Sequence, residues 1–90
     1  MLGDLLASLT DETTAVETIL GAGDLALLTA AREQAAADGV DLAAYVSQTV
    51  RRYASQASDE EWITLMGSLN RSQDPGATCL KRAFEHVLRG

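Results

Sequence analysis

Cys79 and His86 are the residue types in this chain best suited to nucleophilic or metal chemistry, because a thiolate beside an imidazole is a common reactive pair. They are seven residues apart near the C-terminus, a spacing that places both on one face of a helix. The rise along the axis is about 10 Å, which is too long for a hydrogen bond between them. We therefore expect a small, semi-buried cysteine and a surface histidine.

Three consecutive acids, Asp59, Glu60 and Glu61, are the other group that could hold a metal ion. In the first turn of a helix such neighbours point in different directions, and their negative charges complement the helix dipole. We expect that role for them. The chain also has no glycine-rich phosphate loop. The sequence thus predicts no catalytic, cofactor-binding or metal-binding residue, and a protein that is not an enzyme.

Cys79 is the single cysteine, so an internal disulfide is impossible, and no Cys/His spacing suits structural zinc. A single cysteine without a disulfide partner fits a reducing, cytoplasmic compartment. No run of about 18 apolar residues is present, and the N-terminus lacks the basic segment of a signal peptide. We expect a cytoplasmic protein that does not enter a membrane.

Two groups of apolar residues are candidates for an interaction surface. Trp62 and Met66 are four residues apart on an expected helix, and tryptophan is frequent among residues that dominate binding energies. A role in the core is the default expectation for this pair, because the chain has few large residues. Leu2, Leu5 and Leu6 form a stripe in a lead-in segment, residues 1–9, that is too short for a stable helix of its own. This lead-in is expected to be frayed, bound to a partner or packed on its own chain.

The remaining patterns predict amphipathic helices joined by short linkers. The clearest stripe has spacings of three and four residues and consists of Leu42, Tyr45, Val46, Thr49, Val50 and Tyr53. We expect this helix at the centre of the core. Other expected inward stripes are Leu25, Leu28, Ala31 and Ala35; Trp62, Leu65, Met66 and Leu69; and Leu80, Ala83, Phe84, Val87 and Leu88.

Helix ends are indicated by residues with capping chemistry. Asp24, Asp41 and Ser58 are expected N-caps, Asp74 followed by Pro75 reads as a cap and first helical residue, and Gly39 suits a left-handed helix end. Residues 14–17 have the spacing of a capping box that begins at Thr14. Residues 14–20 are also the one stretch that could form a strand, and the sequence leaves helix and strand open there.

Size and composition favour one all-α domain over residues 1–90, a compact bundle of four to five short helices. The chain has 90 residues, 47% of them hydrophobic, which is enough for one core and too few for two domains. Alanine and leucine, both strong helix formers, supply most of this fraction. A domain of this size has little stability to spare, so association into a homodimer would help it.

The charges are unevenly distributed along the chain. The net charge is −6, and residues 1–50 carry eight acids against Arg32 alone. Nucleic acids and anionic membranes attract basic faces, so we do not expect either as a partner. The cations of the second half would change that expectation if they formed one patch, which the sequence leaves open: Arg51, Arg52, Arg71, Lys81 and Arg82.

Residues 24–58 contain a stripe of leucine and alanine, a turn at Gly39 to Asp41, and the residues Val-Arg-Arg-Tyr at 50–53. In these features they resemble the helical part of ribbon-helix-helix proteins. That resemblance implies an intertwined dimer that reads DNA with a paired N-terminal strand. Residues 14–20, where this strand would lie, contain Glu17 and no lysine or arginine. The region from Asp59 to Arg82 is similar to small bacterial helical proteins of unknown function, a similarity that implies no activity.

The sequence therefore favours a non-catalytic helical module that binds proteins and associates with itself. Its expected surface consists of Leu2, Leu5, Leu6, Trp62 and Met66. The alternative is a DNA-binding, transcription-regulator-like protein of the ribbon-helix-helix type. No small-molecule substrate or cofactor is evident.

Overall fold

The structure, a computed structural model, describes residues 2–89, and at Leu2 and Arg89 it describes the backbone alone. Six α-helices and no strand occupy these residues, so the all-α expectation is confirmed and the expected number of helices, four to five, is too low. The helices are α1 (Leu2–Leu9), α2 (Glu12–Gly21), α3 (Leu25–Asp38), α4 (Leu42–Gln56), α5 (Asp59–Arg71) and α6 (Pro75–Arg89).

The lead-in accounts for the extra helix, because it forms α1 and is separated from α2 by a turn at Thr10 and Asp11. The Asp11 side chain accepts hydrogen bonds from both the backbone N–H and the hydroxyl of Thr14. These bonds lower the pKa of Asp11. The expected cap at Thr14 is therefore wrong, and Thr14 lies within α2. Residues 14–20, left open between helix and strand, are helical.

The other expected helix ends are confirmed. Asp24, Asp41 and Ser58 each accept a hydrogen bond from the backbone N–H three residues further on. Asp74 accepts one from the N–H of Ala77, and Pro75 is the first residue of α6. Gly39 follows α3 with a φ of 71°, in the left-handed region. Glycine adopts this conformation without steric strain because it has no Cβ.

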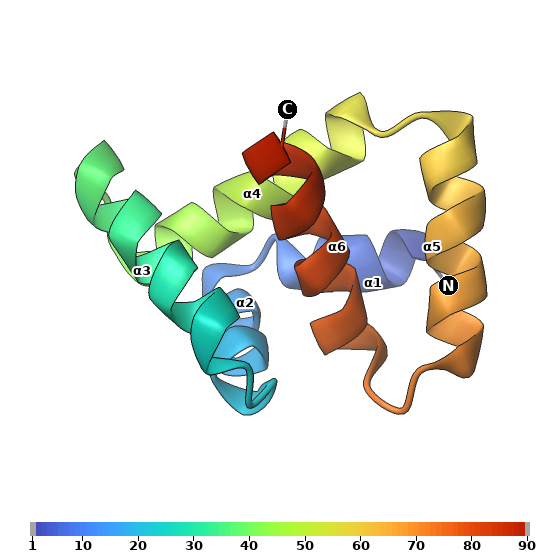
Figure 1. Ribbon diagram of the computed structural model, residues 1–90, viewed down its shortest axis with the longest axis horizontal. Coiled ribbons are helices and arrows are strands. Elements are labelled where there is room, and N and C mark those ends of the chain that lie inside the picture. Colours follow the sequence, from blue (N-terminus) through green and yellow to red (C-terminus); the bar gives the residue numbers. More distant parts are fainter. Residues whose placement is uncertain (1, 90) are drawn as a thin grey trace.

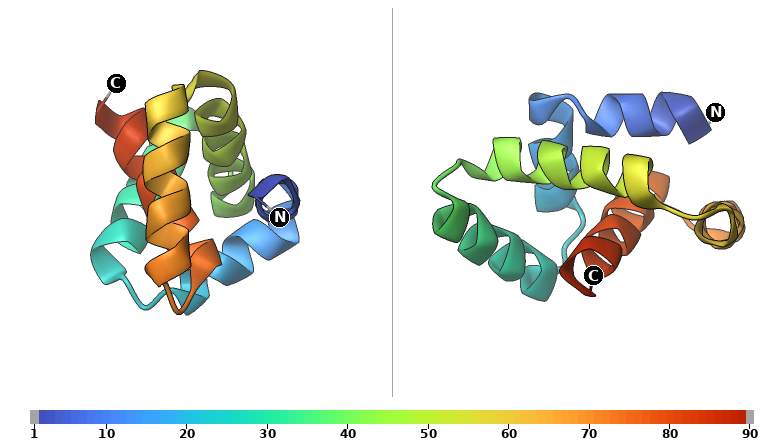
Figure 2. Two further views of the ribbon diagram at one scale, coloured as in Figure 1. Left: turned by 90° about the vertical axis from the view of Figure 1, so that its right-hand side faces the viewer. Right: turned by 90° about the horizontal axis from the view of Figure 1, so that it is seen from above.

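Helix α4 lies at the centre of the molecule, as its stripe predicted. From above it is flanked by α1 on one side and by α3 and α6 on the other (Figure 2), and α6 crosses it in Figure 1. Its inward residues are buried, with Val46, Val50 and Tyr53 fully enclosed. One hydrophobic cluster fills the space between the helices, and its remaining buried members are Leu9, Ala15, Ile19, Ala31, Ala35, Tyr45, Leu65, Cys79, Leu80, Ala83 and Phe84.

Three residues of the expected inward stripes instead face outward, among them Met66 of α5, which is 46% exposed. Leu25 is 76% exposed because it lies in the first turn of α3, before the turns that Ala31 and Ala35 seat in the core. Leu88 is 49% exposed and lies near the end of α6, beyond the buried Ala83 and Phe84. Within residues 2–89, no helix combines the length and the apolar character needed to cross a membrane.

Candidate functional site

Helix α5 is the element with two different faces, one turned to the body of the protein and one turned away. It stands at one edge of the molecule, beside α6 (Figures 1 and 2), and α6 is the helix with which it makes its main contacts. Ser58 caps it, and its first turn carries Asp59, Glu60 and Glu61.

The inner face of α5 is anchored in the core. Leu65 is completely buried, and Trp62 and Leu69 are partly buried against the core cluster. The Trp62 ring lies 5.4 Å from the Tyr53 ring, centroid to centroid, at an angle of 59°. Such tilted aromatic pairs are favourable. Trp62 therefore packs partly against the core.

Glu61 forms a polar clasp, by which we mean Tyr53, Glu61 and Arg82, contributed by α4, α5 and α6. The Tyr53 hydroxyl donates a hydrogen bond of 2.6 Å to Glu61 Oε2. Arg82 donates two, from Nε to Oε2 at 2.8 Å and from Nη2 to Oε1 at 2.9 Å. This paired geometry matches the flat guanidinium to the carboxylate. The clasp thus ties three helices together at one carboxyl group.

The electrostatics of the clasp fix the charge of each member. The hydrogen bonds from Arg82 lower the pKa of Glu61 despite its partial burial. Burial raises the pKa of Tyr53, with a further rise from the neighbouring Glu61, and the contact with Glu61 raises the pKa of Arg82. A carboxylate, a neutral phenol and a guanidinium therefore persist through the neutral range. No member is poised to exchange a proton there, as a general acid or base must be.

The two residues singled out for chemistry are more enclosed than expected. Cys79 is fully buried rather than semi-buried, and burial raises the pKa of its thiol to about 11, so it stays protonated. His86 is partly buried, not on the open surface, and packs edge-on against Tyr53 with ring centroids 5.4 Å apart. In the described part of the chain, no three His, Cys, Asp or Glu side chains are grouped to hold a metal.

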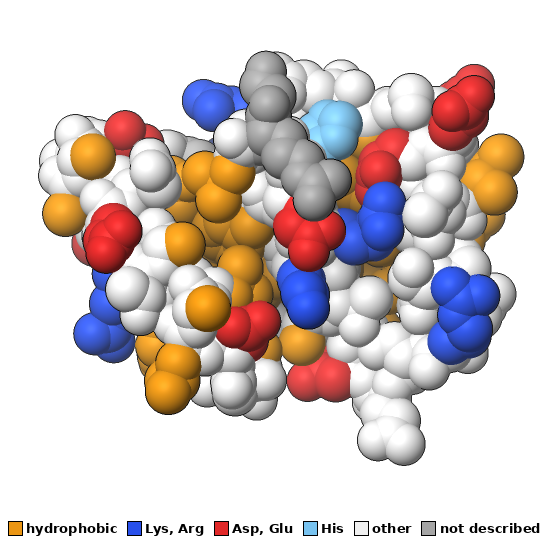
Figure 3. Space-filling view, viewed as in Figure 1, with side chains coloured by type: hydrophobic (Ala, Val, Ile, Leu, Met, Phe, Trp, Pro, Cys, Tyr) orange, Lys and Arg blue, Asp and Glu red, His pale blue; other side chains and the backbone are white. Residues whose placement is uncertain are grey.

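The outer face of α5 carries apolar side chains in solvent. Ile63 is 69% and Met66 46% exposed. Gly67 follows, and a methyl group placed on it would meet no atom within 4 Å. Figure 3 shows hydrophobic side chains projecting at the edge of the molecule where α5 lies.

The residues of the expected surface are divided by the structure. Leu5 and Leu6 are partly buried against the core cluster, and Leu9 after them is fully buried, so the lead-in packs on its own chain. The side chain of Leu2 lies outside the described residues. Of the four whose side chains the structure describes, Met66 alone is substantially exposed, and it lies one helical turn from Ile63, which the sequence reasoning missed.

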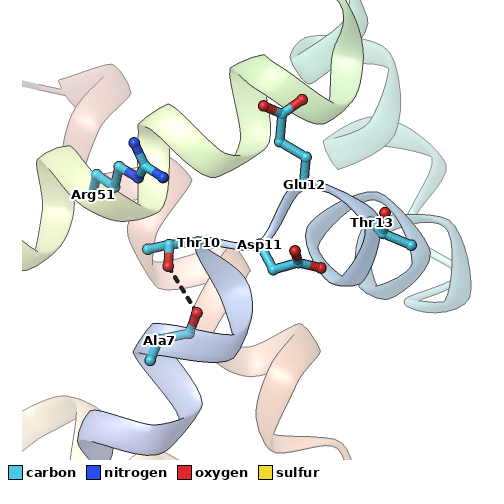
Figure 4. A pocket seen from close by; sticks show the side chains of 6 residues that line it. All are labelled: Ala7, Thr10, Asp11, Glu12, Thr13 and Arg51. Atoms are coloured by element: carbon cyan, nitrogen blue, oxygen red, sulfur yellow. Dashed lines mark hydrogen bonds between the residues drawn. The ribbon is translucent and has the colours of Figure 1, made fainter.

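The five cations do not form a single patch. Arg82 is held by Glu61. Arg51 lines an open hollow of about 410 Å³ with Asp11 and Glu12 (Figure 4), and Lys81 lines a separate one of about 200 Å³ with Asp24.

Arg52 lines a third hollow, of about 360 Å³, together with Asp38, and Arg71 is exposed at the end of α5. Blue side chains are accordingly scattered among red ones in Figure 3. Each of the three hollows thus brings a cation near an acid, and none of them concentrates positive charge.

In comparisons with known proteins, the chain matches no protein-family model, no curated protein and no solved structure. The functional reading therefore depends on the residues and geometry described above.

Proposed function

We propose that the chain is a non-catalytic helical module that binds proteins, and that its partner is a second copy of itself. The observation that carries this proposal is the outward pair Ile63 and Met66 on α5. Both belong to a helix whose opposite face already supplies its contacts with the core. Ile63 and Met66 are therefore not needed for packing within the monomer and remain available to a partner.

A second copy suits such a surface for a general reason. In a symmetric dimer, one patch serves both subunits, and this is the commonest arrangement of soluble oligomers. A chain of 90 residues also leaves a larger share of its surface exposed than a larger domain does, so pairing adds burial that the monomer lacks.

A DNA-binding, transcription-regulator-like role of the ribbon-helix-helix type ranks second. Residues 14–20, which would supply the strand, are part of α2, and the cations are dispersed. A cytoplasmic location remains part of the proposal, since a lone buried cysteine suits a reducing compartment.

Sedimentation equilibrium of the full chain tests the proposal. We expect a mass that rises from one toward two monomers as the concentration increases through the micromolar range. Ile63→Asp should weaken this association, whereas Leu25→Asp, which changes an equally exposed leucine at the start of α3, should not. A full chain that remains monomeric at every concentration would overturn self-association.

A further inference from the structure

We infer that two copies pair through α5 in antiparallel orientation, with Ile63 and Met66 at the centre and Glu60 of each copy beside Arg71 of the other. This inference deepens the proposed self-association and rests on it.

The helical repeat places the relevant side chains on one side of α5. With about 100° of rotation per residue, Ile63, Met66, Gly67 and Asn70 fall within roughly 60° of a common direction. Leu65 and Glu61, which are buried or clasped, fall on the opposite side. The outer face is therefore a continuous strip along the helix, and Ile63 and Met66 on it remain exposed among the described residues.

Gly67 lets a second backbone come close to this strip. Glycine inside a helix costs about 1 kcal/mol relative to alanine, and within residues 2–89 no neighbouring atom occupies the space its missing side chain leaves open. A neighbouring helix can use that space, since helices approach more closely where side chains are small.

Charge complementarity specifies the orientation. Glu60 and Arg71 are both exposed, and no ion pair within residues 2–89 engages either of them. Eleven residues separate them, so they project from the same flank within about 20° and lie about 16 Å apart along the axis.

A twofold axis midway between Glu60 and Arg71 would place the acid of each copy opposite the base of the other. This axis would lie between the two α5 helices, at the level of Leu65 and Met66. It therefore also brings the Ile63–Met66 pairs of the two copies together. In a symmetric parallel pair, Glu60 and Arg71 of one copy would lie on the opposite flank from those of the other, so the Glu60–Arg71 contacts would not form.

Two charge reversals test this geometry. Glu60→Arg alone opposes two cations at each contact of the pair, and Arg71→Glu alone opposes two anions. At low salt we expect each variant by itself to dimerise at least about tenfold more weakly than the native chain, because exposed charges interact across less than a Debye length there. Mixed together, the two variants restore opposite charges at both contacts, so a heterodimer should form with near-native affinity.

Native mass spectrometry distinguishes the heterodimer from either homodimer, and sedimentation gives the dissociation constants. Glu85→Arg, the same charge change at an exposed position of α6, is the control and should dimerise like the native chain. Circular dichroism checks that every variant is folded.

The outcomes separate the inference from the proposed function. If the native chain dimerises but the reversals have no effect, or if mixing fails to restore pairing, the α5 geometry is wrong while self-association stands. If the native chain is monomeric throughout, both are wrong. Preferential formation of the mixed dimer supports the antiparallel pair, since an interface elsewhere gives these two positions no reason to complement each other.

Discussion

Glu61 is the residue at which the three helices of the C-terminal half meet. Its two carboxylate oxygens accept hydrogen bonds from Tyr53 of α4 and Arg82 of α6, while its backbone N–H donates one to Ser58, the N-cap of α5. Such charge-assisted bonds are stronger than neutral ones, and losing one partner leaves the others without their acceptor.

Replacing this carboxylate should lower the stability of the monomer. We expect Glu61→Gln to reduce the free energy of unfolding by about 1 to 3 kcal/mol, because the amide cannot accept both bonds from Arg82. Glu85→Gln, at an exposed site, should change it by less than about 0.5 kcal/mol. Urea unfolding followed by circular dichroism measures both. Equal stability of the two variants would show that the clasp contributes nothing.

The same carboxylate should make stability depend on pH. Its pKa is lower in the folded protein than the ordinary value of 4.5, so unfolding takes up a proton when the pH lies between the two values. The stabilisation from Glu61 is therefore complete above about pH 4.5 and is lost as the pH falls through the folded-state pKa. The stability difference between the native chain and Glu61→Gln should shrink over that acidic interval. A difference that stays constant down to pH 2 would contradict this assignment.

At the scale of single residues, the sequence predicted the helix caps but not the hydrogen bonds between helices. The caps at Asp24, Asp41 and Ser58 follow from contacts three residues apart, so they are readable from the chain. The bond between Glu61 and Arg82 spans 21 residues and depends on how α5 and α6 pack. No periodicity separates Glu61 from Asp59 and Glu60 except its place on the Leu65 side of the helix.

Among the elements, the turn between α3 and α4 depends on a backbone conformation that favours glycine. Gly39 adopts a positive φ, and its N–H and that of Val40 bond to the carbonyls of Ala36 and Ala35, which closes the end of α3. A side chain at this position would be strained even though the surrounding space is open.

Substitution of this glycine should therefore destabilise the fold. We expect Gly39→Ala to raise the free energy of the folded state by about 1 kcal/mol. Gly3→Ala is the matched control, because Gly3 lies in α1 with a negative φ and open space, and alanine favours a helix there. Thermal melting should show opposite or unequal shifts for the two. Equal shifts would mean that the backbone conformation at Gly39 is not the cause.

Helix boundaries were predictable where a cap and a stripe agree, and less so elsewhere. The break between α1 and α2 depends on Asp11, a cap that competes with the capping-box spacing of Thr14 and Glu17. In the strip on α5, Met66 was expected as a surface candidate, whereas Ile63 was missed because it lies outside the stripe of Trp62, Leu65 and Met66. Apolar residues around more than half of a helix do not reveal which face the fold will cover.

The whole molecule carries its positive charge in separate places. Arg51, Arg52 and Lys81 line different hollows, each of which also contains an acid, and the net charge is −6. Affinity for duplex DNA grows with the number of phosphates that one basic face can neutralise.

We therefore expect no stable duplex binding at about 0.15 M salt, where exposed charges more than about 8 Å apart are largely screened. Fluorescence anisotropy of a labelled duplex, titrated with the native chain, measures this. Binding that survives an excess of unlabelled competitor would favour the ribbon-helix-helix alternative instead.

The edge position of α5 also bears on the motions of the native chain. This helix is held mainly by α6 and by the clasp, whereas α4 is enclosed by its neighbours. Regions with few buried contacts open at lower free energy than the core. Amide protons of α5 should thus exchange with solvent through openings that leave α4 closed. Pairing with a second copy would slow that exchange, and acid well below pH 4.5, by protonating Glu61, would speed it.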